Sequence, residues 1–304
     1  MKTAKAFSPG HITGLFFMCL GHEDPLFNGS LGAGVSLSRG VTTHVSCDEA
    51  FSKGISISIN GQKRSDAIVS KKVLDLFFSG TGLSLNGRLR VNHVIDIPQG
   101  SGFGSSGAAA LSLSIALNEL FKTNISIIEA AQIAHVAEIE CSTGLGTVLG
   151  EMAGGLKIST VPGAPGIGKT KPISYSENLS AIFLTFGKYP TSSALKNPDI
   201  RETINSNGRK YLEKLEASPS LSNFLYYSRE FADSINLISS RVRGVLDDLD
   251  IADIMGSMLM FGEAVFTIVD NERLEKVVSI YKKHIKTASI MTTTVSEDGG
   301  YLIA

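Results

Sequence analysis

Cysteine is scarce in this sequence, and its few cysteines show no pattern. The 304 residues include only Cys19, Cys47 and Cys141, an odd number without a C-x-x-C spacing. This distribution supports neither a disulfide framework nor a zinc site built from cysteines. We therefore expect reduced, buried thiols in a cytoplasmic protein.

An excess of charge of one sign is also lacking. The chain has 28 Lys and Arg against 29 Asp and Glu, a formal net charge of −1 at pH 7, and no basic run stands out. Nucleic-acid-binding surfaces normally show a basic patch or stripe, so we expect no nucleic-acid partner. A charged share of 19% and a hydrophobic share of 43% exclude a disordered chain and predict a packed core.

The sequence has no apolar run long enough to cross a membrane. An apolar run at residues 12–20 follows Lys2 and Lys5 and so mimics a signal peptide. However, Pro9 and Gly10 interrupt the approach to it, no small-residue cleavage site follows, and the run is too short to span a bilayer. The sequence therefore predicts a cytoplasmic protein that is not secreted and has no membrane partner.

Glycine, by contrast, is concentrated in one stretch around which the rest of the chain is organised. An alternating apolar pattern over residues 89–97 predicts a strand, and a helical pattern over residues 105–121 predicts a helix. Between them stand Gly100, Gly102 and Gly104. Glycines at these alternate positions let the backbone bend freely and approach a bulky ligand closely.

The start of this helix suits an anion. The free N–H groups of a first turn and the positive end of the helix dipole favour phosphate. Ser105 and Ser106 stand where their hydroxyls can reach a phosphate or a bound Mg²⁺. Two other interpretations stay open here, a plain loop with an N-cap and a dinucleotide fingerprint at Gly102, Gly104 and Gly107. The fingerprint is a poor match because it belongs to an early βαβ unit with an acidic residue about 20 residues further on.

A second stretch also satisfies a phosphate-loop pattern. Residues 163–170 match G-x-x-x-x-G-K-[ST] and follow a predicted strand at 156–161. A helix has to open at Lys169, yet Pro172 follows at once, and the residue before a proline avoids the α region. We therefore predict that residues 162–172 form a surface loop that joins two domains.

The remaining periodicity predicts an α+β chain. A first strand over residues 3–9 is followed by a turn at residues 8–14, which is rich in small residues, and further strands follow at 29–45 and 54–60. The other expected elements are helices at 66–78, 126–140, 199–216, 220–243, 247–256 and 271–284, and strands at 180–186, 265–269 and 290–295.

Three stretches resemble the motifs of one enzyme family, in the order that the family has them. Residues 98–110 are similar to the phosphate loop of the GHMP kinases, such as galactokinase, homoserine kinase and mevalonate kinase. Phe103 replaces the usual leucine of that loop and Gly107 the usual alanine. Residues 6–16 and 256–266 resemble the first and third motifs of the family. The resemblance is greatest to the pantoate kinases, an archaeal branch of this family.

This resemblance implies a two-lobed α+β GHMP kinase fold. Residues 1–161 would form an N-terminal, ribosomal-S5-like lobe that carries the phosphate loop. Residues 173–304 would form a C-terminal, ferredoxin-like lobe, with ATP and the acceptor in the cleft between the lobes. The glycines of residues 256–266 would let a loop close over the phosphate site.

The resemblance also implies roles for individual residues. Glu138, with Ser105, would hold the Mg²⁺ of MgATP, which suits a cation that keeps few protein ligands. His11 becomes a catalytic candidate. From the residues alone, other interpretations stay open: His11 as a structural histidine, Arg39 as a solvated strand charge and Glu138 as an exposed helix charge. The acceptor-side candidates are Thr13, Arg39, Thr143 and Gly144, and the residues expected to hold ATP are Gly100, Ser101, Gly102, Phe103, Gly104, Ser105 and Ser106.

Thr147 departs from the family pattern at a position of catalytic interest. The family usually has an aspartate there, a candidate base for the substrate hydroxyl, and a threonine cannot take a proton at neutral pH. Three interpretations follow. Catalysis could rest on positioning and charge neutralisation, the substrate could differ from pantoate, or the protein could have lost catalysis.

The sequence thus predicts an ATP-dependent kinase that acts on a hydroxyl of a small branched hydroxy acid. The first expectation is (R)-pantoate, converted to 4-phosphopantoate for coenzyme A biosynthesis. The alternatives are phosphorylation of mevalonate 3-phosphate at its 5-hydroxyl in isoprenoid biosynthesis, and a non-catalytic nucleotide-binding paralogue. The expected cofactors are ATP and Mg²⁺, and a homodimer is left open.

Overall fold

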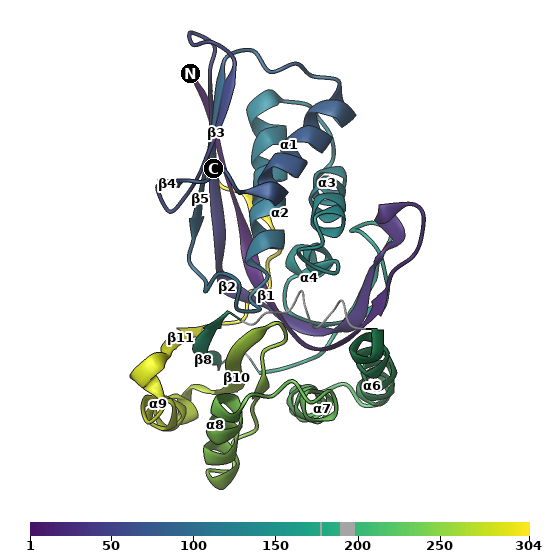
Figure 1. The fold of residues 1–304 in the computed structure, drawn as a ribbon, viewed down its shortest axis with the longest axis vertical. Coiled ribbons are helices and arrows are strands. Elements are labelled where there is room, and N and C mark those ends of the chain that lie inside the picture. The colour runs from purple at the N-terminus through teal and green to yellow at the C-terminus, as the bar shows by residue number, and fades with distance from the viewer. Residues whose placement is uncertain (177, 189–197) are drawn as a thin grey trace.

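The computed structural model describes residues 1–176, 178–188 and 198–304, which form two sheets with helices packed on them (Figure 1). The first sheet has the strand order β12-β1-β2-β5-β3-β4, and a hairpin of β6 and β7 extends from β2. The second sheet has the order β11-β8-β10-β9. The strand bounds are β1 Lys2–Cys19, β2 Gly29–Asp48, β3 Gly54–Ile59, β4 Gln62–Lys63, β5 Arg88–Ile95, β6 Leu156–Val161, β7 Lys169–Pro172, β8 Leu179–Lys188, β9 Ser257–Met258, β10 Gly262–Asp270, β11 Ser289–Thr293 and β12 Tyr301–Leu302.

The helices divide between the two sheets. Helices α1 to α4 lie on one face of the first sheet, whereas α7, α8 and α9 contact the second sheet and α6 contacts β1 (Figure 1). This mixed arrangement confirms the predicted α+β class. The helix bounds are α1 Ile68–Thr81, α2 Ser105–Phe121, α3 Ile127–Glu140, α4 Thr147–Ala153, α6 Pro198–Ala217, α7 Leu221–Ser234, α8 Ser240–Ile251 and α9 Leu274–Lys282, with short 3₁₀ turns at Pro25–Phe27, Asn271–Arg273 and Ile285–Thr287.

Helix α2 is the central helix of the first lobe. Its middle, residues 107–117, is buried on every side, as expected of a helix that is apolar all round. It contacts both β1 and β2 on one side and α1, α3 and α4 on the other. The strand, loop and helix predicted around residues 89–121 are therefore confirmed, with β5 ending at Ile95 and α2 beginning at Ser105.

The predicted turn at residues 8–14 is wrong. These residues lie within the long strand β1, which pairs with β2 from Lys2 to Cys19. The small residues produce shifts of register at Pro9/Gly10 and Thr13/Leu15 instead of a reversal. They also permit close packing, because a β-carbon at Gly14 would overlap the side chain of Ser228 on α7.

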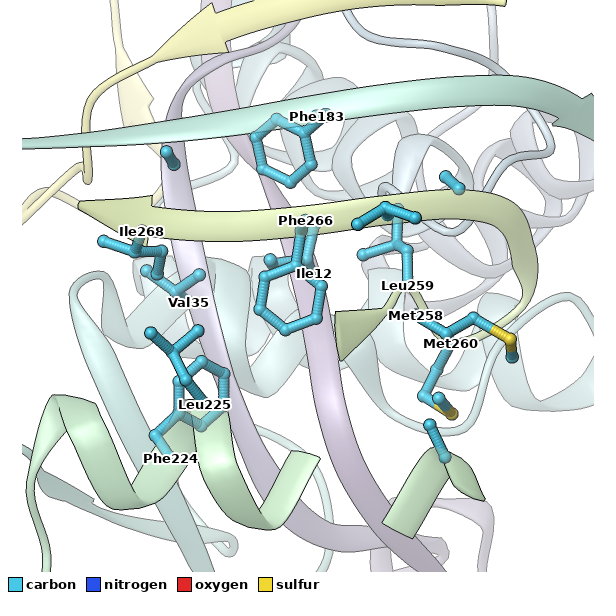
Figure 2. Close-up of a cluster of buried hydrophobic side chains, with 14 of the residues drawn as sticks. Ile12, Val35, Phe183, Phe224, Leu225, Met258, Leu259, Met260, Phe266 and Ile268 are labelled. Atoms are coloured by element: carbon cyan, nitrogen blue, oxygen red, sulfur yellow. The ribbon is translucent and has the colours of Figure 1, made fainter. Parts of the chain in front are cut away.

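The long strands connect the two parts of the core. One buried cluster holds Ile12 and Val35, from β1 and β2, together with Phe183, Phe224 and Phe266 of the later elements (Figure 2). A second cluster lies between the first sheet and helices α1 to α3. The phosphate-loop region, between β5 and α2, therefore lies where β1 and β2 pass from one cluster to the other.

Two further predictions need correction. Residues 169–172 are not loop but strand β7, which forms a hairpin with β6, so the predicted loop at 162–172 is shorter. The helix expected over 220–243 is two helices, because Asn236 takes a left-handed φ of 54° and Ser239 caps the start of α8. Of the helix expected over 247–256, only residues 247–251 are helical, and they are the last residues of α8, which ends at Ile251.

The described residues contain no helix that is both long and apolar enough to cross a membrane.

Candidate active site

The glycine-rich loop between β5 and α2 has the backbone that its sequence predicts. Gly100, Gly102 and Gly104 have φ values of 70°, 87° and 68°, in the left-handed region that favours glycine. Gly104 is also the N-cap of α2, without a side-chain hydrogen bond to the first turn. The N–H groups at the start of α2 therefore remain available to an anion.

Phe103 fixes this loop to the body of the protein. Its side chain is 1% exposed, and its ring lies edge-on to that of Phe183 with the centroids 4.9 Å apart. The carbonyl oxygen of Phe103 accepts a hydrogen bond from the backbone N–H of His11 at 3.1 Å. Both contacts hold the loop between β1 and the second sheet, so Phe103 acts on the site as an anchor.

The third motif packs directly against this loop. A β-carbon at Gly102 would overlap the carbonyl oxygen of Met260, and one at Gly262 would overlap the carbonyl of Ser101. Glycine is therefore required on both sides of the contact between the two segments. Residues 256–266, which resemble the third motif, therefore lie against the glycine-rich loop, and closure of this stretch over the phosphate site stays a prediction.

Lys188 also lies beside the loop, and sequence analysis did not single it out. The methylene carbons Cγ, Cδ and Cε of Lys188 would lie 3.1–3.2 Å from a β-carbon at Gly100. The exposed ammonium of Lys188 has no hydrogen bond or ion pair with another residue of the described ranges. Its position at the end of β8, far along the chain, gives no local sequence signal.

The serines at the start of α2 meet the turn that follows α3. Ser106 Oγ donates to Thr143 Oγ1 at 3.3 Å. Gly144 lies against the next functional candidate, because a β-carbon there would overlap the carboxylate of Glu138. The fold thus brings Ser106, Glu138, Thr143 and Gly144 together from two helices and the turn between α3 and α4.

Glu138 is buried, which removes the interpretation of an exposed helix charge. It lies on α3 with 1% exposure, and its Oε2 has no hydrogen-bond partner among the described residues. Burial raises the pKa of Glu138 to about 7, while the hydroxyl of Thr147 and the N–H groups of residues 146–148 oppose the rise. Thr147 therefore faces the predicted metal ligand and is half-buried at the start of α4.

Glu151 is a second buried carboxylate at this place, which sequence analysis missed. Its exposure is 0%, and neither of its oxygens has a hydrogen-bond partner within the described part of the chain. Burial raises the pKa of Glu151 well above its ordinary value, and the charge of Glu138 raises it further. The only sequence signal is its spacing, since Glu151 follows Thr147 by four residues on α4.

His11 lies next to α4, in the sheet. Its Nδ1 is 3.2 Å from Ser36 Oγ, and that hydroxyl donates to the carbonyl oxygen of Gly150 at 3.0 Å. Because the hydroxyl proton is used, Nδ1 is the donor to Ser36 and Nε2 is the free acceptor. Burial lowers the pKa of His11 to about 4, so the ring is neutral at neutral pH.

The other acceptor-side candidates lie in β1 and β2. Arg39 pairs with Asp96 through both ends of its guanidinium, with Nε 2.8 Å from Oδ2, and both side chains remain partly exposed. This pair raises the pKa of Arg39 and lowers that of Asp96. Thr13 is half-buried and lies opposite Gly34 in the β1–β2 ladder. Neither residue makes a described contact with Glu138.

The donor set fits a small divalent cation. Among the described residues, no three His, Cys, Asp or Glu side chains are placed so that they could hold a metal ion together, so a protein-only cage is not present there. Mg²⁺, however, is usually held by one or two carboxylates together with water and substrate phosphates. Glu138 supplies a buried carboxylate whose Oε2 has no hydrogen-bond partner among the described residues. Its Oε1 would lie 3.0 Å from a β-carbon at Gly107, the residue that follows Ser106 in α2.

Known proteins share the length and the fold of this chain. The family model described as the GHMP kinases N-terminal domain matches residues 69–155. A pantoate kinase of Thermococcus kodakarensis is 34% identical over 276 residues, which cover 90% of this chain and 89% of the relative. A pantoate kinase of Methanocaldococcus jannaschii is 33% identical over 279 residues, which cover 92% and 97%. A solved phosphotransferase related to the CoA biosynthesis pathway superposes with a TM-score of 0.89 at 29% identity, covering 99% of this chain and 98% of that one.

The chain therefore belongs to the GHMP kinase family, and its two-lobed α+β architecture is the fold of that family. It is a kinase of the type that transfers a phosphoryl group to a hydroxyl. Both of these relatives, which match nearly the whole chain, are pantoate kinases.

Proposed function

We propose that this protein transfers the γ-phosphoryl group of ATP to a hydroxyl of (R)-pantoate, giving 4-phosphopantoate for coenzyme A synthesis. The observation that carries the proposal is the 34% identity to a pantoate kinase across 90% of the chain. The similar solved structure, related to CoA biosynthesis, supports the same assignment.

The geometry supports the nucleotide half of this reaction. The residues proposed to hold the ATP phosphates are those of the loop, Gly100 to Ser106, whose N–H groups point to no competing backbone partner within the described residues. Lys188 is proposed to add a positive charge beside them. Glu138 with Ser105 would hold Mg²⁺, which when bound neutralises phosphate charge and orients the transferred group.

The acceptor half is proposed from the neighbouring residues. Thr143 and Gly144 border Glu138, and Thr13 and His11 lie on the adjacent strand β1. Arg39 remains a candidate for the pantoate carboxylate only if the substrate replaces Asp96 as its partner. The division into lobes of residues 1–161 and 173–304 stays a prediction, since it includes residues 189–197, outside the described part.

Thr147 sets the mechanism that we propose. A threonine hydroxyl does not act as a general base at neutral pH. Phosphoryl transfer depends mostly on positioning and electrostatic stabilisation, so the reaction can proceed without an aspartate here. The neutral ring of His11 can accept a hydrogen bond through Nε2, which suits a role in orienting a hydroxyl.

The experiment that tests the proposal is coupled ADP release with MgATP and a panel of acceptors. Turnover with (R)-pantoate, confirmed by mass spectrometry of 4-phosphopantoate, is the expected result. Turnover only with mevalonate 3-phosphate would assign the alternative function, in which Thr147 marks a change of substrate. ATP binding without turnover on pantoate, mevalonate or mevalonate 3-phosphate would contradict both. A cytoplasmic location and a homodimer also stay predictions.

A further inference from the structure

Glu151 occupies the space directly beneath the phosphate loop. A β-carbon at Gly104 would lie 2.8 Å from its Oε1, and one at Gly107 would lie 2.9 Å and 2.8 Å from its Oε1 and Oε2. The β-carbon at Gly107 would also lie 3.0 Å from Oε1 of Glu138. Three carboxylate oxygens from two helices therefore converge on the space that Gly107 leaves open at the first turn of α2.

Two departures from the family motif adjoin this carboxylate. Gly107 stands where the motif usually has alanine, and an alanine methyl would meet both oxygens of Glu151. Thr147 stands where the family usually has aspartate, and it lies one helical turn before Glu151. The first position of α4 thus has no carboxylate, but Glu151 supplies one a helical turn later. The absence of a side chain at Gly107 leaves room for it.

In the part of the chain that the structure describes, the two carboxylates lack the positively charged partner that a pair of buried negative charges requires. Two buried carboxylates this close repel each other, and a buried charge without a partner is costly. Within the described residues, Glu138 Oε2 and both oxygens of Glu151 have no hydrogen-bond partner by geometry, although the N–H of Ala108 is close enough to oppose the rise in the pKa of Glu151. No Lys or Arg of these residues forms an ion pair with either carboxylate. An ATP phosphate on the loop above would add further negative charge. A divalent cation is the ligand that satisfies all of these groups together.

We propose that Glu151 is a second protein carboxylate for the divalent cation, acting together with Glu138. This inference rests on the proposed function, because it assumes that the loop binds a nucleotide with its metal. The two carboxylates, the serine hydroxyls at the start of α2 and the nucleotide phosphates then form one oxygen-rich set. Glu151 supplies its carboxylate from a position one helical turn after Thr147 on α4.

The direct test is Mn²⁺ binding to the full chain, followed by electron paramagnetic resonance in the presence of ADP. E138Q and E151Q each replace a carboxyl group that can bind a cation as a carboxylate with a neutral amide, with little change of shape. E140Q is the matched control, because Glu140 lies on the same helix as Glu138 but pairs with Lys72 at the surface. We expect E151Q and E138Q to weaken Mn²⁺ binding by about tenfold or more, since even outer partners of a metal site contribute about 10–100-fold. E140Q should bind as the wild type does.

The outcomes separate the inference from the proposed function. Mn²⁺ affinity of E151Q within about twofold of the wild type, with E138Q weakened, would overturn the role of Glu151 and leave the kinase assignment intact. A wild type that binds neither Mn²⁺ nor ADP would instead overturn the proposed function. Should E151Q fail to fold by circular dichroism, E151D takes its place, since it keeps the charge but withdraws the oxygens. Weaker Mn²⁺ binding by E151D supports the inference, and wild-type affinity refutes it.

Discussion

Residues 98–104 and residues 162–168 are both glycine-rich loops that follow a strand, yet they lead into different elements. The first opens helix α2, whereas the second turns back into strand β7 and completes a hairpin with β6. In the second loop, the N–H groups of Ile167 and Gly168 both donate to the carbonyl oxygen of Ala164, at 2.9 and 2.8 Å. The N–H of Ala164 donates in turn to the carbonyl oxygen of Leu26, so these three donors are already used.

The first loop keeps its donors free. Within the described residues, none of the N–H groups of residues 100–107 donates to a backbone carbonyl, and the first bond of the helix runs from Ala108 to Gly104. A phosphate site needs unpaired N–H groups at the start of a helix, and a matching pattern of glycine and lysine does not supply them. The comparison shows that the element after a glycine-rich loop decides what the loop can bind.

The largest difference between the loops should be a difference in the loss of stability when Phe103, the hydrophobic anchor of the first loop, is truncated. F103A leaves a cavity against Phe183, and we expect it to lower the free energy of unfolding by about 3–5 kcal/mol. F103L, which restores the residue usual in the family, should cost less than about 1.5 kcal/mol. Urea denaturation of both variants measures this, with I167A in the second loop as a control. Equal losses for F103A and I167A would contradict the anchoring role.

Acid should lower the free energy of unfolding through protonation of His11, whose backbone N–H donates to Phe103 of the first loop. Its pKa is 6.5 in the unfolded chain and about 4 in the fold, so the unfolded state binds the extra proton first. The stability that this buried neutral ring contributes is present above pH 6.5 and is lost as the pH falls toward 4, by about 3 kcal/mol. H11N removes the group, so the excess stability of the wild type over H11N should shrink from pH 7 to pH 4 in urea titrations. A constant difference would contradict the buried neutral state.

Two glycines offer a matched test of backbone strain against site geometry. Gly102 and Gly166 have φ values of 87° and 88°, so alanine costs roughly 1–2 kcal/mol of stability at either position. Only at Gly102 does the β-carbon meet backbone, the carbonyl of Met260, whereas at Gly166 it meets the side chain of Ile128. We expect G102A to lower kcat/KM by about 100-fold through displacement of the loop, and G166A to leave it unchanged. Similar kinetics in the two variants would show that residues 256–262 do not position the loop.

The sequence predicted those parts of the site that local chemistry determines. The positive φ at Gly100, Gly102 and Gly104 and the start of α2 at Ser105 follow from residue types and spacing within a few positions. The same local reasoning failed at residues 8–14, where small residues suggested a turn. There, pairing with β2 and the packing of α7 on Gly14 keep the chain extended.

The missed residues depend on tertiary contacts. Glu151 resembles any helix carboxylate in sequence, and only the packing of α4 under α2 buries it beside Glu138. Lys188 ends a strand of the second sheet, which reaches the loop because β8 pairs with β10 at Gly262. The helix predicted over residues 126–140 is confirmed as α3, which carries Glu138, but the burial of Glu138 could not be read from these residues alone.

The smallest expected effect concerns two lysines, Lys169 and Lys188, as candidates for contact with the nucleotide. The sequence pattern favours Lys169, whereas the structure favours Lys188. Lys169 stands in the G-K-T pattern, but it begins strand β7 and pairs with Val161 of β6, so it does not open a helix. Lys188 matches no pattern, but its stem crosses Gly100 of the first loop. We expect K188A to raise KM for ATP about tenfold, as loss of one charge-assisted contact of about 1.4 kcal/mol at an exposed position would do. K169A should leave KM unchanged. Steady-state kinetics with saturating acceptor measure both values of KM. A larger rise in KM for ATP in K169A than in K188A would indicate that the nucleotide binds at the second loop.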